Sequence, residues 1–201
     1  MIKGIGGQPY IALDEHIDIE GFRNLHPEIC RGFALAREYA KEGTWMSPGF
    51  DPKDMSYQLN WKPIYMALEE YKAFPGLVNW IKELVKSGII ESIGRVIFFH
   101  CEHDGKPFEH RDLDGKHGDN QGYSGHKNEF IHIRHNTKRG FYIWDPEKQN
   151  KVYINSNAAF WNDQDWHGGE VNAEQEYGLR IDCVFTDNFR KKLGIDKLSE
   201  Y

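Results

Sequence analysis

Six short β-type segments in the C-terminal half constrain the fold of this chain more than any other feature. Each is rich in β-branched or aromatic residues and is bounded by Gly, Asn, Asp or Pro. The segments are 90–102, 128–136, 139–145, 150–156, 157–161 and 177–187, and the stretch DPEKQN forms a hairpin loop between two of them. Their close and regular spacing favours antiparallel pairing, and it predicts a barrel or a sandwich.

The N-terminal half carries helical signals instead. Three segments have helical composition or spacing, at 26–43, 59–76 and 77–88. We expect the second to stop at Pro75-Gly76 and the third to end near Gly88. Because no repeat, low-complexity run or linker separates the halves, these helices are expected to pack on the outside of one sheet.

The expected organisation is therefore one composite domain over residues 1–201. It comprises a mainly helical part (1–89), a β core (90–187) and a C-terminal tail (188–201). The formal net charge of −6 argues against a general nucleic-acid-binding surface. No apolar run of signal-peptide or membrane-spanning type is present, so we expect a soluble, cytoplasmic protein. Cys30, Cys101 and Cys183 lack metal-site spacing and are expected to be reduced thiols.

The stretch FEHRDLDGKHGD contains two His-x-Asp pairs, His110 with Asp112 and His117 with Asp119. Residues two apart on a strand point to the same side, so each pair offers two ligands of a two-histidine, one-carboxylate iron site. The first pair follows a strand, which holds ligands rigidly. The second lies in a Gly- and Asn-rich loop (113–125), which we interpret as a lid. Strand support therefore favours His110 and Asp112 as the metal pair.

A third ligand and an anion-binding residue are expected further along the chain. His167, in WNDQDWHGGEVN, is the best candidate for the ligand. Arg180 lies within YGLRIDCVF, where it shares a strand face with Asp182. An arginine inside an apolar strand requires an anion. One interpretation is a salt bridge to Asp182 or to a neighbouring acid. The other is that Arg180 binds the carboxylate of a ligand.

Taken together, His110-Arg111-Asp112, the distant His167 and Arg180 thirteen residues later resemble the Fe(II)/2-oxoglutarate-dependent oxygenases. The resemblance covers about residues 95–187. It implies an α+β, mainly β fold, a double-stranded β-helix or jelly-roll barrel of cupin-like form. It also implies Fe(II) held by His110, Asp112 and His167, with 2-oxoglutarate bound through Arg180 and O2 as the oxidant.

The segment IHIRHNT (131–137) is similar to a strand of the aspartyl/asparaginyl β-hydroxylase branch of that family. The similarity implies that His132 contacts a carboxylate of 2-oxoglutarate. The chain departs from the branch pattern at Arg134-His135-Asn136, where the branch has apolar residues.

The function implied is a 2-oxoglutarate- and Fe(II)-dependent dioxygenase that hydroxylates an amino-acid or peptide side chain or a small molecule. Neither a nucleic-acid nor a membrane partner is expected. One alternative is a cupin-like metal lyase or isomerase, which needs no arginine for a cosubstrate. Another is a non-catalytic jelly-roll binding module. Candidate substrate residues are Arg134, Tyr142, Trp144, Trp166 and His117.

Overall fold

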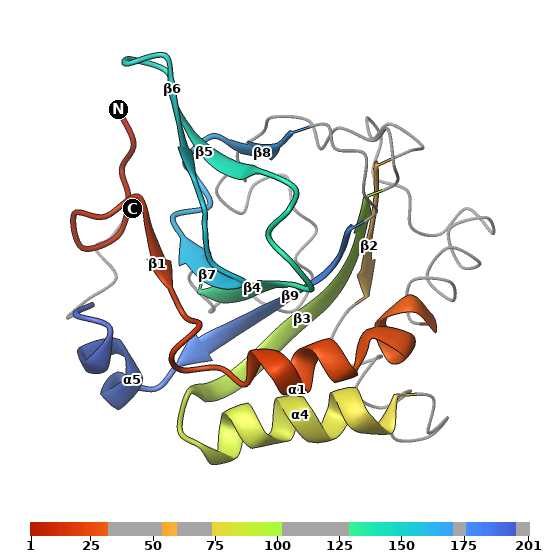
Figure 1. Ribbon diagram of the computed structural model, residues 1–201. Coiled ribbons are helices and arrows are strands. Elements are labelled where there is room, and N and C mark those ends of the chain that lie inside the picture. Colours follow the sequence, from red (N-terminus) through yellow and green to blue (C-terminus); the bar gives the residue numbers. More distant parts are fainter. Residues whose placement is uncertain (32–53, 60–73, 102–128, 171–175, 196–201) are drawn as a thin grey trace.

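Two antiparallel sheets form the body of the computed structural model, which describes residues 1–31, 54–59, 74–101, 129–170 and 176–195 (Figure 1). The larger sheet has the order β1-β7-β4-β9-β3-β2 and the smaller sheet the order β6-β5-β8. The larger sheet contains β1 (Tyr10–Ala12), β2 (Asp54–Leu59), β3 (Ile90–Cys101), β4 (Phe130–Arg134), β7 (Ala158–Trp161) and β9 (Glu176–Phe185). The smaller sheet contains β5 (Phe141–Asp145), β6 (Asn150–Tyr153) and β8 (His167–Gly169).

From β4 to β9 the chain passes back and forth between the two sheets. β4 belongs to the larger sheet, β5 and β6 to the smaller, β7 to the larger, β8 to the smaller and β9 to the larger. Every strand pair in the described ranges is antiparallel. This alternation is the winding of a jelly roll. The prediction of a mainly β, α+β double-stranded β-helix is therefore confirmed.

The two faces of the larger sheet differ in chemistry. Ile131, Ile133, Leu179 and Ile181 point to one face and are fully buried. The alternate positions on the same strands, His132 and Arg180 among them, point to the other face. One face of the sheet is therefore an ordinary apolar core, whereas the other carries buried titratable groups.

Two helices cover the apolar face. α1 (Ile19–Asn24) and α4 (Pro75–Lys86) lie side by side on that side of the larger sheet (Figure 1). The rings of Phe22 and Trp80 join them, with centroids 5.5 Å apart. Leu77 and Ile81 on α4 are fully buried. The expectation that the N-terminal helices pack outside one sheet is confirmed.

The helix predicted over 59–76 is wrong at both of its ends. Leu59 ends strand β2, and Pro75 and Gly76 are the first two residues of α4. Proline has no backbone N–H, so it fits the first turn, where that group would have no partner in the helix. Residues 60–73 lie outside the described ranges. α4 ends at Lys86, and Gly88 just beyond it has φ +75°, as expected of a helix stop.

The first predicted helix, over 26–43, is described only to residue 31, and residues 26–31 are helical. Near the other end of the chain, α5 (Asp187–Lys192) occupies part of the predicted tail. Its Arg190 donates from Nε and Nη2 to the buried carboxylate of Glu129, at 2.7 and 2.8 Å. This bidentate pair fixes α5 against the start of β4. None of the helices in the described ranges is long and apolar enough to cross a membrane.

Candidate active site

The polar face of the larger sheet points toward the smaller sheet. His132 on β4 lies directly opposite Arg180 on β9 and opposite Ala159 on β7. Directly opposed residues of an antiparallel pair share a face, and so does Trp161, two residues beyond Ala159. His132, Arg180 and Trp161 thus come from three neighbouring strands and point into the interior between the sheets.

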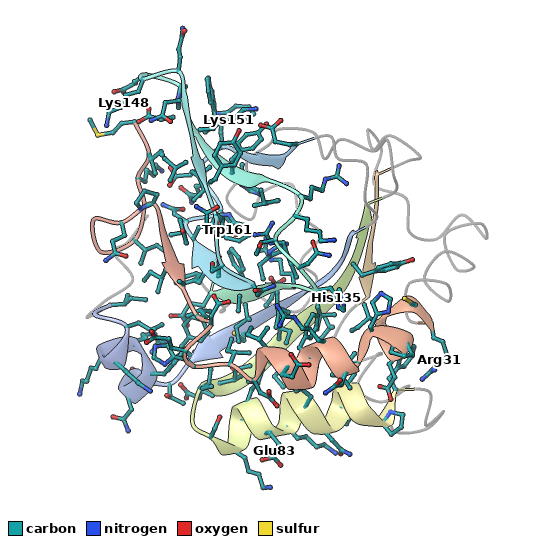
Figure 2. The ribbon with its side chains drawn as sticks, viewed as in Figure 1. Arg31, Glu83, His135, Lys148, Lys151 and Trp161 are labelled. Atoms are coloured by element: carbon teal, nitrogen blue, oxygen red, sulfur yellow. The ribbon has the colours of Figure 1, made fainter. Side chains whose placement is uncertain are left out.

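Four rings meet in that interior. His132 and Trp161 belong to the larger sheet, whereas Phe141 and His167 belong to the smaller. The His132 and Phe141 rings are stacked with centroids 5.1 Å apart, and Trp161 lies 5.1 Å from His132 and 5.6 Å from His167. Figure 2 shows Trp161 inside the molecule, while Lys148 and Lys151 lie at the outer β5–β6 hairpin. The fold therefore brings the predicted residues His132 and His167 together.

His167 is oriented by the backbone. Its Nδ1 lies 2.8 Å from the carbonyl oxygen of Asp165. A carbonyl can only accept, so Nδ1 carries the proton and the lone pair belongs to Nε2. Metal-binding histidines commonly donate their second ring nitrogen in this way. His167 is 3% exposed, so its Nε2 is presented inside the barrel.

The turn that carries this carbonyl is held by the N-terminal segment. The two carboxylate oxygens of Asp165 accept from the backbone N–H groups of Lys3 and Gly4, at 2.7 and 2.8 Å. Within the turn, Asp165 N donates to the carbonyl of Asn162. The residues before His167 are thereby fixed to a segment more than 160 residues away in sequence.

Arg180 forms ion pairs with two acids. Its Nε donates to Asp182 Oδ1 at 2.7 Å, and its Nη2 donates to Asp163 Oδ2 at 3.2 Å. The guanidinium also stacks over Phe130, 3.9 Å from the ring centroid. The predicted salt bridge to Asp182 is therefore present. The second interpretation, an anchor for a ligand carboxylate, stays a prediction, and any such ligand would share Arg180 with these acids.

His132 is neutral at physiological pH. Burial lowers the pKa of this imidazole well below its ordinary value, and the positive charges of Arg134 and Arg180 lower it further. A neutral imidazole both donates and accepts a hydrogen bond. His132 can therefore bind a ligand oxygen without adding charge to the site.

Arg134, a predicted substrate residue, binds backbone carbonyls. Nη1 donates to the carbonyl of Arg139 at 2.9 Å, and Nη2 to those of Ile154 and Ser156 at 2.7 and 3.1 Å. These bonds join the segment after β4 to the segment after β6. The geometry is that of a structural clamp, and contact of Arg134 with a substrate stays a prediction.

The structure does not bring the predicted aromatic substrate residues together with His132 and His167. Tyr142 and Trp144 alternate with Phe141 and Ile143 on β5, so they lie on the opposite face of the smaller sheet. On that face, Nζ of Lys151 lies 4.2 Å from the centroid of the Tyr142 ring. Trp166 is 38% exposed. Their roles in substrate binding remain predictions.

Both His-x-Asp pairs lie outside the described residues, as does the segment interpreted as a lid. Within the described ranges, no group of three or more His, Cys, Asp or Glu side chains is arranged to hold a metal ion. His167 is thus the one predicted iron ligand that the described structure places.

Cys30 and Cys183 are free thiols. Cys183 is buried on the apolar side of β9, and burial raises its pKa well above the ordinary value. Cys30 is half-buried, with Sγ 3.6 Å from His26 Nε2, and burial raises its pKa as well. Neither is a thiolate at neutral pH, so neither has the character of a nucleophile.

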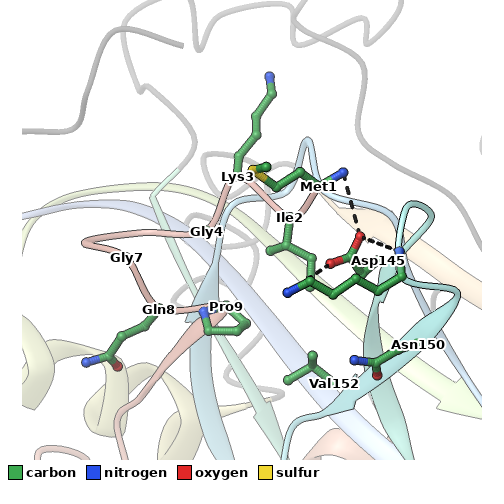
Figure 3. A pocket seen from close by; sticks show the side chains of 11 residues that line it. Met1, Ile2, Lys3, Gly4, Gly7, Gln8, Pro9, Asp145, Asn150 and Val152 are labelled. Atoms are coloured by element: carbon green, nitrogen blue, oxygen red, sulfur yellow. Dashed lines mark hydrogen bonds and ion pairs between the residues drawn. The ribbon is translucent and has the colours of Figure 1, made fainter.

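A hollow of about 210 Å³ lies elsewhere, between the N-terminal segment and the β5–β6 hairpin (Figure 3). Its charged groups pair with one another. The Met1 ammonium lies 3.6 Å from Asp145 Oδ1 and 3.0 Å from Glu147 Oε1. The barrel interior, with its imidazoles and ion pairs, is chemically the better candidate site.

Three site residues were missed by sequence reasoning. Phe141 and Trp161 line the interior, and Asp163 pairs with Arg180. Trp161 ends an apolar run, and Asp163 follows it after Asn162 in FWND, so an acid near a strand end was the available signal. Which strand faces which could not be inferred from that pattern.

Comparisons with known proteins find similarity in structure only. No family model matches the chain, and no curated protein matches it. A prolyl-4-hydroxylase of Pseudomonas putida is 10% identical with TM-score 0.48, covering 89% of this chain and 94% of its own. A full-length Neurospora crassa protein, solved in complex with alpha-KG, is 9% identical with TM-score 0.49, covering 84% and 72%.

A viral collagen prolyl hydroxylase from Paramecium bursaria Chlorella virus-1, solved with 2OG, is 14% identical with TM-score 0.41. It covers 87% of this chain and 95% of its own. Identities and TM-scores this low do not transfer a reaction to this chain. A relation to the aspartyl/asparaginyl β-hydroxylase branch is not shown.

Proposed function

We propose that this chain is an Fe(II)- and 2-oxoglutarate-dependent dioxygenase that hydroxylates an amino-acid or peptide side chain or a small molecule. The observation that carries the proposal is the orientation of His167. Its Nδ1–H bond to the Asp165 carbonyl presents Nε2 inside a jelly-roll barrel, next to His132 and on the side that Arg180 faces. A buried imidazole fixed in this way fits a metal ligand.

The residues proposed to hold the iron are His110, Asp112 and His167. Two imidazoles and one carboxylate suit Fe(II) and leave positions open for other ligands. Iron and 2-oxoglutarate together would supply the oxidation of a C–H bond by O2, with succinate and carbon dioxide as coproducts.

The protein's own residues would hold and shield the reactants. The Asp165 carbonyl keeps the His167 ring in one tautomer and one orientation. Phe141 and Trp161 surround the imidazoles with apolar surface, which excludes water and strengthens polar contacts. His132 and Arg180, opposite each other on adjacent strands, are proposed to bind the carboxylate of 2-oxoglutarate farther from the metal.

The ion pairs of Arg180 favour a second candidate, a cupin-like metal lyase or isomerase. Asp163 and Asp182 already bring two negative charges to this guanidinium. A reaction without a diacid cosubstrate would not need Arg180 to accept a further carboxylate. The two candidates share the metal ligands and differ in whether 2-oxoglutarate is consumed.

Succinate formation distinguishes them. The purified protein is incubated with Fe(II), 2-oxoglutarate and O2, and succinate is measured over time, since slow turnover can occur without the prime substrate. The dioxygenase predicts succinate that requires both iron and oxygen, and its loss in Asp112→Ala but not in Asp119→Ala. Metal binding without any binding of 2-oxoglutarate would favour the lyase or isomerase instead. Loss of succinate formation in Asp119→Ala but not in Asp112→Ala would instead assign the metal to His117 and Asp119.

A further inference from the structure

Trp161 has a buried donor that the fold does not use. The side chain is 1% exposed, and its Nε1–H meets no acceptor within the described part of the chain. An unsatisfied buried N–H is destabilising by about 1–3 kcal/mol, and such groups are rare in native proteins. An indole nitrogen only donates, so its missing partner must be an acceptor atom.

The position of the indole indicates which acceptor. Trp161 lies 5.6 Å from the ring of His167, the proposed metal ligand. The indole also lies 4.7 Å from the Phe130 ring, and the Arg180 guanidinium stacks on Phe130 at 3.9 Å. Trp161 therefore contacts both the proposed metal ligand and the ring on which Arg180 stacks.

The neighbouring rings do not offer the missing acceptor oxygen. The side chains of Phe130 and Phe141 are hydrocarbon and have no acceptor atom. The His132 ring contacts the Trp161 ring but does not accept from its Nε1–H. Asp182 Oδ1 and Asp163 Oδ2 accept from the Arg180 guanidinium at 2.7 and 3.2 Å, and no acid oxygen of the described residues accepts from the indole nitrogen. A molecule bound at one end by the metal and at the other by Arg180 would bring its own oxygens past the indole.

We propose that Trp161 is a binding residue for the cosubstrate, and that its Nε1–H donates to a carboxylate oxygen of bound 2-oxoglutarate. The inference rests on the proposed function and adds a donor to it. Asp163 and Asp182 already bind Arg180, so Arg180 alone would hold 2-oxoglutarate less strongly. The Trp161 Nε1–H, which has no other partner among the described residues, would add a second hydrogen bond to that ligand.

The test compares two Trp→Phe substitutions. Trp161→Phe removes the unsatisfied donor. Trp80→Phe removes the same atoms from the helical layer, where the indole Nε1 donates to the Asp18 carbonyl at 3.1 Å. Melting temperatures are measured with Mn(II) alone and with Mn(II) plus 2-oxoglutarate, and 2-oxoglutarate is titrated into each protein.

We expect Trp161→Phe to bind 2-oxoglutarate about tenfold more weakly, the value of a hydrogen bond to a charged acceptor. Its response to Mn(II) alone should be unchanged. Trp80→Phe should melt at a lower temperature than Trp161→Phe without ligand, yet bind 2-oxoglutarate as the wild type does. A purely structural role for Trp161 predicts neither the weaker binding nor this order.

A second measurement observes the donor directly. In ¹⁵N spectra of the protein with Zn(II), the indole signal absent from Trp161→Phe identifies Trp161, and 2-oxoglutarate should shift that proton downfield. If 2-oxoglutarate binds but this signal stays in place and both variants keep wild-type affinity, the inference is wrong while the proposed function stands. If the wild type does not bind 2-oxoglutarate at all, both are wrong.

Discussion

Arg180 is the residue whose surroundings bear most on the proposed binding of 2-oxoglutarate. Asp163 and Asp182 balance its charge within a buried space, so a carboxylate that binds Arg180 as proposed would meet two like charges there. Both acids lie on or near the strands that frame the interior, and neither can move away without breaking a buried ion pair. The affinity for 2-oxoglutarate should therefore depend strongly on these carboxylates.

Asp163→Asn should bind 2-oxoglutarate about tenfold more tightly than the wild type, because it removes one buried charge and keeps an oxygen for Arg180 Nη2. Calorimetric titration in the presence of Mn(II) measures this change. Asp187→Asn is the matched control, since its side chain is 86% exposed and pairs with Arg190 on α5. Equal affinities in all three proteins would exclude Arg180 from carboxylate binding.

His132 should make stability depend on pH. Its folded pKa lies below the ordinary value of 6.5, so the unfolded chain binds a proton more readily than the folded one. The contribution is fully present above pH 6.5 and is lost as pH falls toward the folded pKa.

His132→Phe keeps the ring contact with Phe141 and removes the titration. In the metal-free protein, the free energy of unfolding of the variant should fall less steeply below about pH 6.5 than that of the wild type. The two slopes should differ by about 1.4 kcal/mol per pH unit. Urea unfolding at several pH values from about 5 to 8 measures the slopes. Identical slopes for variant and wild type would mean that His132 titrates normally in the fold.

At the scale of elements, most strands of the C-terminal half were predictable, including the short strands β6 and β7, whereas β1, β2 and β8 were not predicted. β3, β4, β5 and β9 lie within one or two residues of the predicted segments, because alternating or continuous apolar residues mark them. β8 is only His167-Gly168-Gly169, and glycine has low strand propensity. It is a strand because β5 pairs with it, which is a tertiary effect.

The candidate site shows the same division. His167 and Arg180 were predicted from residue type and spacing, and His132 from its resemblance to a strand of the β-hydroxylase branch. The alternation in YGLRIDCVF correctly placed Arg180 on the face of β9 opposite to that of Leu179 and Ile181. The partners of these residues could not be predicted. Asp163, just after β7, pairs with Arg180 from 17 residues away, and the bond from His167 to the Asp165 carbonyl depends on the local turn.

Arg134 joins two elements, and its removal should destabilise the fold. Arg134→Met keeps the apolar stem but leaves three carbonyls without this donor, so we expect a loss of at least about 3 kcal/mol in the free energy of unfolding. Lys86→Met, at the exposed end of α4, should change stability by less than about 0.5 kcal/mol. Chemical denaturation provides both values. Unchanged stability with altered turnover would instead support the predicted contact of Arg134 with substrate.

At the scale of the whole molecule, the N-terminal segment supports the site from a distance. The backbone at Lys3 and Gly4 holds the Asp165 carboxylate, and the backbone carbonyl of the same aspartate orients His167. β1 adds the N-terminal segment to the edge of the larger sheet through β7. This segment is therefore linked to His167, the proposed metal ligand, through Asp165.

Asp165→Ala should weaken metal binding about tenfold, because the turn that orients His167 loses its two bonds to the N-terminal backbone. Gln164→Ala is the control, since its side chain accepts an exposed bond from Lys3 Nζ. Competition titration with a coloured chelator measures the affinities of both variants. If Asp165→Ala bound metal like the control, the N-terminal segment would have no part in orienting His167.

The central claim is that His167 is a ligand of a metal that binds together with 2-oxoglutarate. Titration of Mn(II) into the wild type and into His167→Gln, with and without 2-oxoglutarate, can be followed by the EPR signal of free Mn(II). We predict one metal per wild-type chain, tighter binding with 2-oxoglutarate, and binding at least about a hundredfold weaker in His167→Gln. Equal binding by the two proteins, or no stoichiometric binding by the wild type, would contradict the claim.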